Sequence, residues 1–187
     1  MVMLQAGVSL WILAHLFKRL APKAHAKFVK TVGANGAKGI VSLLLLASLF
    51  LIVVGYKRAP VEIVYVLPFR SAYVAHAMMF VAIVFVVMSF WGGFLKHYFR
   101  HPLLIGVVIW AISHLLVNGD VASIVLFGGM WFWAIAEIML INRAEKTWKP
   151  APRGPIREDI RLLIIALSVY AVVNGLHDML GVSTYMG

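Results

Sequence analysis

The sequence has no cysteine and few charged residues, and both deficits narrow the kinds of protein it can encode. Without a thiol, the chain can form no disulfide, no iron–sulfur cluster and no thiolate zinc site. Charged residues make up 13% of its 187 residues, whereas a soluble domain carries about 25%. Acidic residues are scarcest, at 7 Asp and Glu against 17 Lys and Arg. This composition argues against a soluble globular domain.

Apolar residues take the place of the missing charge. They account for 63% of the chain, and the mean hydropathy is +0.93. Apolar runs close to the ~20 residues that cross a bilayer recur along the sequence. We therefore predict an all-α fold, a polytopic integral membrane bundle of six transmembrane helices that forms one domain over residues 1–187. The expected spans are Val2–Phe17, Gly39–Gly55, Ser71–Trp91, Leu103–Val117, Val121–Ile141 and Ile160–Val182.

The basic residues give these spans an orientation. Of the 17 Lys and Arg, 14 fall in the first, third and fifth connections between spans. The connections on the other side carry only Lys57, Arg58 and Arg70. By the positive-inside rule the odd-numbered connections are cytoplasmic, so both termini are expected outside the cytoplasm. Contact with anionic lipid headgroups accounts for the net charge of +10, and we expect no nucleic-acid partner. The first span lacks the features of a cleaved signal peptide and is expected to be retained.

Histidines inside the predicted spans are the main candidates for chemistry, because ionisable groups in a membrane usually face the bundle interior. With a rise of ~1.5 Å per residue, His15 and His114 come out at similar depths on different helices, and His76 is equally close in depth to His114. A lone histidine can also simply bond a neighbouring carbonyl or serine. That structural alternative stays open for each of them.

Tryptophans and polar stripes accompany these histidines. Trp11 precedes His15 by four residues and Trp110 precedes His114 by four, so each pair shares one helix face. Such a pair of histidines between aromatic walls favours a haem held by two imidazoles, whereas zinc or copper would need further ligands nearby. The helix-face stripes that predict a polar or cofactor-filled interior are His114 with Asn118, Trp133 with Glu137, and Tyr170 with Asn174 and His177.

The stretch RHPLLIGVVIWAISHLLVNGDVASIVLFGG, from Arg100 to Gly129, closely resembles the central signature of the NnrU family. The matching features are Arg100-His101-Pro102, Trp110-x3-His114-Leu115, Asn118-Gly119-Asp120, Ala122-Ser123 and Leu126-Phe127-Gly128-Gly129. Weaker matches extend the likeness over nearly the whole chain: His15, Lys38 to Ser42, Gly55-Tyr56 and His177. At the last of these, Asp178 stands where the family is expected to show proline.

The resemblance implies a cofactor and roles for several residues. The family also contains the plant 15-cis-zeta-carotene isomerase, an integral membrane haem b protein, so it implies a haem b iron ligated by two histidines. His114 and His15 are the implied ligands and catalytic residues, with His76 as the alternative to His15. The resemblance also implies residues around the haem. Trp11 and Trp110 would pack against the haem ring, and Asn118 or Asp120 would orient an imidazole. His101 would have a supporting role near the site.

Two functions follow as hypotheses. The first is a redox-gated cis–trans isomerase of a lipophilic polyene, or a related redox role, with a lipophilic substrate and a redox partner in a bacterial inner membrane. The alternative is a non-catalytic assembly or sensing partner in nitric oxide and nitrite metabolism, that is, in denitrification. It would use the basic connections and the Asn118-Gly119-Asp120 turn as contact surfaces. That turn is also an ordinary helix stop and N-cap.

Overall fold

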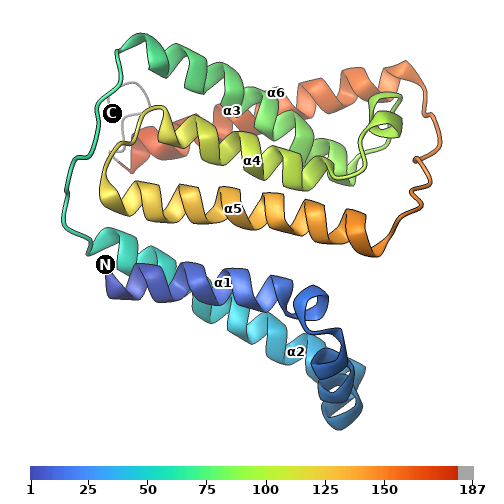
Figure 1. Ribbon diagram of the computed structural model, residues 1–187. Coiled ribbons are helices and arrows are strands. Elements are labelled where there is room, and N and C mark those ends of the chain that lie inside the picture. The colour runs from blue at the N-terminus through green and yellow to red at the C-terminus, as the bar shows by residue number, and fades with distance from the viewer. Residues whose placement is uncertain (181–187) are drawn as a thin grey trace.

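A computed structural model describes residues 1–180, and these residues form six α-helices and one short 3-10 helix, η1 (Figure 1). The all-α prediction and the six helices are confirmed. The elements are α1 (Val2–Leu20), α2 (Pro22–Lys57), α3 (Arg70–Phe90), η1 (Leu95–Tyr98), α4 (Pro102–Leu115), α5 (Val121–Ala144) and α6 (Ile156–Met179).

Four of the helices, α2, α3, α5 and α6, are long and apolar enough to cross a membrane. They suggest an integral membrane protein. The other two helices have shorter apolar segments. Helix α4 has only 14 residues, and the last turn of α1 carries the charged residues Lys18 and Arg19. The corresponding predicted spans, Val2–Phe17 and Leu103–Val117, are likewise shorter than the ~17–25 residues of most transmembrane helices.

The largest departure from prediction is the start of α2, which lies at Pro22 instead of Gly39. Residues 22–32 are helical because alanine and lysine favour helices and a proline suits the first turn. A kink follows at Gly33, where φ is 77° and ψ is 161°, a conformation that glycine adopts readily. At the other end of the chain, the predicted end of the sixth span at Val182 lies outside the described residues.

The helices pack in a continuous series in the order α2, α1, α5, α4, α3, α6 (Figure 1). The start of α1, the connections 58–69 and 116–120 and the end of α6 gather at one end of the bundle, here called the N-terminal end. The connections 91–101 and 145–155 gather at the opposite end with residue 21, which joins α1 to α2. We call this second end the basic end, because most of the predicted cytoplasmic Lys and Arg residues flank it.

Two glycines bring α1 and α2 into backbone contact. A Cβ atom at Gly55 would meet the backbone of Leu4, and one at Gly7 would meet the backbone nitrogen of Ile52. Leu4 is fully buried at this contact. Small residues allow such close approach between helices in membranes, where van der Waals packing replaces the hydrophobic effect as the driving force. The α1–α2 pair therefore depends on the absence of these two side chains.

Gly55→Ala is expected to destabilise the protein by about 1–3 kcal/mol, because the added methyl group forces α1 away from α2. The midpoint of thermal unfolding in detergent measures the effect. Gly39→Ala is the matched control on the same helix, since a Cβ atom at Gly39 has nothing within 4 Å. The control should keep or slightly raise the midpoint. Equal midpoints for the two variants would contradict the packing described.

Candidate functional site

Three histidines from three helices line one cavity near the N-terminal end of the bundle: His76 on α3, His114 on α4 and His177 on α6. The cavity has a volume of about 410 Å³, within the ~300–1,000 Å³ usual for a ligand pocket. It lies between α3, α4, α5 and α6, next to the last turn of α2. The other lining residues are Tyr56, Ala75, Met79, Trp110, Ser113, Val117, Asn118, Leu126, Phe127, Tyr170, Val173 and Asn174.

The imidazole of His114 is held by its own helix. Its Nδ1 lies 2.9 Å from the carbonyl oxygen of Trp110, one turn earlier. A carbonyl oxygen can only accept, so Nδ1 is the donor and a neutral ring leaves the lone pair on Nε2. His177 repeats the arrangement, with Nδ1 2.8 Å from the carbonyl oxygen of Val173. This is the state in which a histidine ligates a metal, with its second nitrogen fixed by a backbone carbonyl.

His76 has a different partner. Its Nδ1 lies 2.8 Å from the hydroxyl of Tyr170, which joins α3 to α6 across the cavity wall. The predicted stripe of Tyr170, Asn174 and His177 on α6 is confirmed as part of the lining. Asn174 donates to the carbonyl oxygen of Tyr170 at 2.8 Å, so its amide also bonds within its own helix.

Aromatic rings form the wall beside His114. The ring of Phe127 stacks on the imidazole at 4.4 Å between centroids with 23° between planes. Trp110 contacts the imidazole at 5.0 Å and the Phe127 ring edge-on at 5.1 Å. The Asn118 amide donates to the carbonyl oxygen of His114 at 2.9 Å. Of the predicted site residues, the structure thus brings together His114, Trp110 and Asn118.

His15 lies elsewhere in the bundle. Its ring sits between Trp11 and Trp133, at centroid distances of 4.4 and 4.6 Å, and it is not among the described residues that line the cavity. On α5, Trp133 follows Phe127, the neighbour of His114, by six residues, which is about 9 Å along the axis. His15 and His114 therefore contact different turns of α5. Their pairing on one haem stays a prediction.

The stripe of Trp133 and Glu137 faces α1 and not the cavity. Arg19 lies 4.0 Å from Glu137, and Trp133 meets the ring of Trp11 edge-on at 5.4 Å. Among the described residues, Trp11 Nε1, Trp133 Nε1 and Glu137 Oε2 are buried without a hydrogen-bond partner. Trp11, expected to wall a haem with His15, thus belongs to the contact between α1 and α5.

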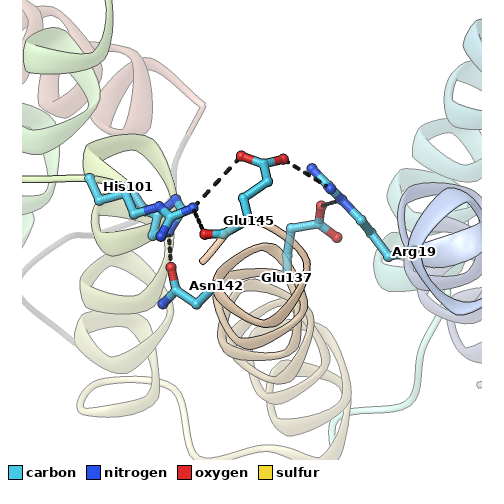
Figure 2. A network of polar contacts seen from close by, with 6 residues as sticks. Arg19, His101, Glu137, Asn142 and Glu145 are labelled. Atoms are coloured by element: carbon cyan, nitrogen blue, oxygen red, sulfur yellow. Dashed lines mark hydrogen bonds and ion pairs between the residues drawn. The ribbon is translucent and has the colours of Figure 1, made fainter. Parts of the chain in front are cut away.

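The remaining predicted residues have structural partners. His101 lies at the basic end, where its Nε2 donates to the Asn142 side-chain oxygen at 2.8 Å (Figure 2). The Asp120 carboxylate accepts from the backbone N–H of Ser123 at 2.9 Å and from its hydroxyl at 2.5 Å. Asp120 is therefore the N-cap of α5, as the helix-stop interpretation of the turn predicts, and its described bonds go to Ser123 and not to an imidazole.

Tyr56 is a cavity residue to which sequence reasoning gave no role. Its hydroxyl lies 2.8 Å from the Ser123 hydroxyl. Ser123 gives its single hydroxyl proton to Asp120, so Tyr56 donates to Ser123. A continuous chain of hydrogen bonds runs from the cavity through Ser123 to the carboxylate at the Asp120 turn. The weak Gly55-Tyr56 match was a signal, but the partner on α5 could not be known from it.

An extended segment of the connection between α2 and α3, residues 59–68 and here called the strap, docks on the Asn118-Gly119-Asp120 turn. The backbone N–H groups of Val64 and Tyr65 donate to the Gly119 carbonyl oxygen at 2.8 and 3.2 Å. The Tyr65 hydroxyl donates to the Leu115 carbonyl oxygen at 2.6 Å. A Cβ atom at Gly119 would collide with the Tyr65 carbonyl oxygen, so this contact requires glycine in the turn.

Metal-ligating side chains do not gather in larger groups. Within residues 1–180, no set of three His, Asp or Glu side chains is placed to hold a metal ion. The cavity offers separate imidazoles among aromatic and apolar walls. This arrangement suits a cofactor that brings most of its metal ligands with it.

The family model described as NnrU protein matches residues 3–184, nearly the whole chain. The chain belongs to the NnrU family. The match spans α1 to α6 and includes all three cavity histidines and the Asp120 turn. No curated protein and no solved structure matches the chain.

Tyr65→Phe is expected to reduce the loss of stability at high pH. Burial and, to a lesser extent, the charge of Asp120 raise the pKa of Tyr65 above its ordinary value of 10.0. The folded protein then holds this proton more tightly than the unfolded chain. The resulting stabilisation is complete below pH 10.0 and is lost as the pH rises from there through the folded-state pKa. Thermal midpoints from about pH 8 to about pH 11 measure it.

The control for this prediction is Tyr73→Phe, a tyrosine that is 62% exposed on α3. The difference in midpoint between the unchanged protein and Tyr65→Phe should narrow above pH 10.0. The Tyr73 variant should follow the unchanged protein across the range. A constant difference for Tyr65→Phe at every pH would show that the Tyr65 proton is not linked to folding.

Proposed function

We propose that this NnrU protein binds haem in the three-histidine cavity, where His114 and His177 would hold its iron. The observation that carries the proposal is that both imidazoles line one cavity from separate helices, each with Nδ1 bonded to its own helix and Nε2 left for a metal. His76 and His15 are the alternatives to His177.

The cavity lining fits a haem on two counts. Porphyrin supplies four nitrogens to its iron, so the protein needs to add only one or two ligands, and separate histidines are what the cavity provides. The wall formed by Trp110, Leu126, Phe127 and Val173 suits the apolar faces of the ring. These features support haem over a bare metal ion, which would require three or four protein ligands.

The reaction proposed is a redox-gated isomerisation of a lipophilic polyene, or a related redox step. When bound, haem supplies an iron that changes oxidation state and can exchange one axial ligand. The chain's own residues would hold that group and exclude water from it with aromatic side chains. The hydrogen bonds from Tyr56 to Ser123 and from Ser123 to Asp120 fix the direction of the Tyr56 hydroxyl in the cavity lining.

The non-catalytic alternative receives less support from the molecule. A partner-binding role for the Asn118-Gly119-Asp120 turn requires free groups there. The strap already bonds the Gly119 carbonyl oxygen, and the Val121 N–H donates to the Glu62 carbonyl oxygen at 2.9 Å. The Asp120 side chain caps α5. The turn is therefore bonded within its own fold, which leaves the basic connections as the contact surface available to this alternative.

We also propose that all six helices cross the bacterial inner membrane, with both termini outside the cytoplasm. The start of α1 and the end of α6 lie at the same end of the bundle (Figure 1). Lys and Arg are abundant at the opposite end, which is the pattern of a cytoplasmic face. The 14-residue α4 is shorter than the ~20 residues of a typical span, and local thinning of the bilayer would accommodate it.

His114→Ala is expected to abolish haem binding, because it removes one axial ligand and the residue around which the wall is built. The ratio of haem to protein after expression with added haem, together with the oxidised and dithionite-reduced spectra, provides the measurement. His177→Ala should lose haem or turn a six-coordinate low-spin spectrum into a five-coordinate one. His25→Ala, on a residue that packs on Phe17 near the basic end, is the matched control and should keep full loading.

Each alternative has its own result. A fully loaded His114→Ala protein would contradict the proposal, as would an unchanged protein that stays colourless after haem is added. If His15→Ala loses haem and His177→Ala does not, the second ligand is His15, as the family resemblance implies. If His76→Ala loses haem and His177→Ala keeps it, the second ligand is His76.

A further inference from the structure

A cup of basic side chains lies at the basic end of the bundle, on the side away from the three-histidine cavity. It encloses about 480 Å³. Arg19 comes from the last turn of α1, Arg100 from the connection before α4 and Lys149 from the connection after α5. Three positive charges from separate segments thus surround the carboxylate of Glu145, and Arg19 also lies 4.0 Å from the carboxylate of Glu137. His101 and Trp148 complete the polar part of the rim.

Glu145 forms ion pairs with both Arg19 and Arg100, and Figure 2 shows the contact with Arg19. Its carboxylate accepts from Arg19 at 3.1 Å and lies 3.7 Å from Arg100, which also donates to the Glu145 carbonyl oxygen at 2.7 Å. The arginine side chains are 22% and 18% exposed, whereas the Glu145 side chain is 55% exposed. Each guanidinium has five N–H donors. These bonds orient both groups and leave donors for another anion.

Lys149 adds a charge without a carboxylate of its own. None of the described ion pairs involves it. It lines the cup and also a second cavity of about 430 Å³ beside it. The two cavities share Arg100, His101, Trp148 and Lys149. The charged cup therefore continues directly into a neighbouring groove.

That groove has an apolar wall. Phe99, Pro102, Leu103 and Leu104 line it, from the start of α4 and the connection before it. The Leu103 side chain is 42% exposed and belongs to neither of the hydrophobic core clusters formed by the described residues. The apolar wall offers nothing to a small soluble anion, which would use only the basic residues of the two cavities. A ligand with a charged head and an apolar tail would use both cavities.

The position of the cup matches the level of lipid headgroups. It lies where α1 and α5 end and α4 begins, just beyond the apolar part of these helices. Trp148 stands on its rim, and tryptophan is enriched at the interface between membrane and water. Basic pockets between membrane helices on the cytoplasmic side are known sites for anionic headgroups. Arginine adds planar, two-pronged recognition of a phosphate.

We infer that the cup and groove bind one anionic phospholipid, with its phosphate among Arg19, Arg100 and Lys149 and its first apolar segment against Leu103 and Leu104. Glu145 holds the two arginines apart and competes with the lipid for their donors. Bound there, the lipid would connect α1, α4 and α5 at the end of the bundle opposite the strap. The inference makes no use of haem.

Native mass spectrometry of the full chain in detergent tests the inference. The probes are phosphatidylglycerol, phosphatidylcholine with the same acyl chains, and inorganic phosphate. Phosphatidylglycerol should remain bound in preference to phosphatidylcholine. Arg100→Gln and Lys149→Gln should each weaken that binding about fivefold, the effect expected for one basic residue at a membrane surface. Glu145→Gln should strengthen it, because a competing negative charge is removed.

Arg157→Gln is the matched control, with the same change of charge near the same end on a side chain that is 75% exposed and lines neither cavity. It should leave lipid binding unchanged. Equal retention of the two lipids, or an equal loss in Arg157→Gln and Arg100→Gln, would overturn the inference. Displacement of the lipid by millimolar inorganic phosphate would overturn the role of the groove. Lys149→Gln breaks no described ion pair, so its result does not depend on whether Arg100→Gln folds.

Discussion

Hydrogen bonding of a buried imidazole to its own helix is the constraint on which the candidate site depends. In an apolar helix an unsatisfied N–H group is costly, and the carbonyl oxygen four residues earlier is the nearest acceptor. His15, His114 and His177 all use it through Nδ1. The bond fixes both the direction of the ring and the nitrogen that keeps the lone pair. Two such rings, His114 and His177, line one cavity, whereas the same bond at His15 holds the ring between two tryptophans.

The two ends of the bundle are secured by different interactions. At the N-terminal end, backbone bonds of the strap and the cap at Asp120 fix the turn between α4 and α5. At the basic end, Glu145 connects α1 to the segment before α4 through Arg19 and Arg100. The cavity lies near the first of these ends, so the rigid backbone network supports the site. The ion pairs are partly exposed and are expected to contribute little to stability.

Sequence reasoning located what local patterns determine. Apolar runs gave the helices, four-residue spacing gave the α6 stripe of Tyr170 to His177, and the order Asn-Gly-Asp gave the cap of α5. It did not anticipate helical residues 22–32, because a surface helix without an apolar run resembles a basic loop. It also matched His15 with His114 by depth, and depth does not specify which helices touch. The strap was missed because its bonds join Tyr65 to residues about fifty positions away.

The contact between α1 and α5 has a consequence for the synthesis of the protein. Val8 packs under Gly129, and Arg19 finds its partner Glu145 126 positions later in the chain. At ~5–20 residues per second, a ribosome needs roughly 6–25 s to supply that partner. During this interval the α1–α2 hairpin is held by its own contacts, among them those at Gly7 and Gly55. The first helix pair can thus pack before the acidic partner of Arg19 has been made.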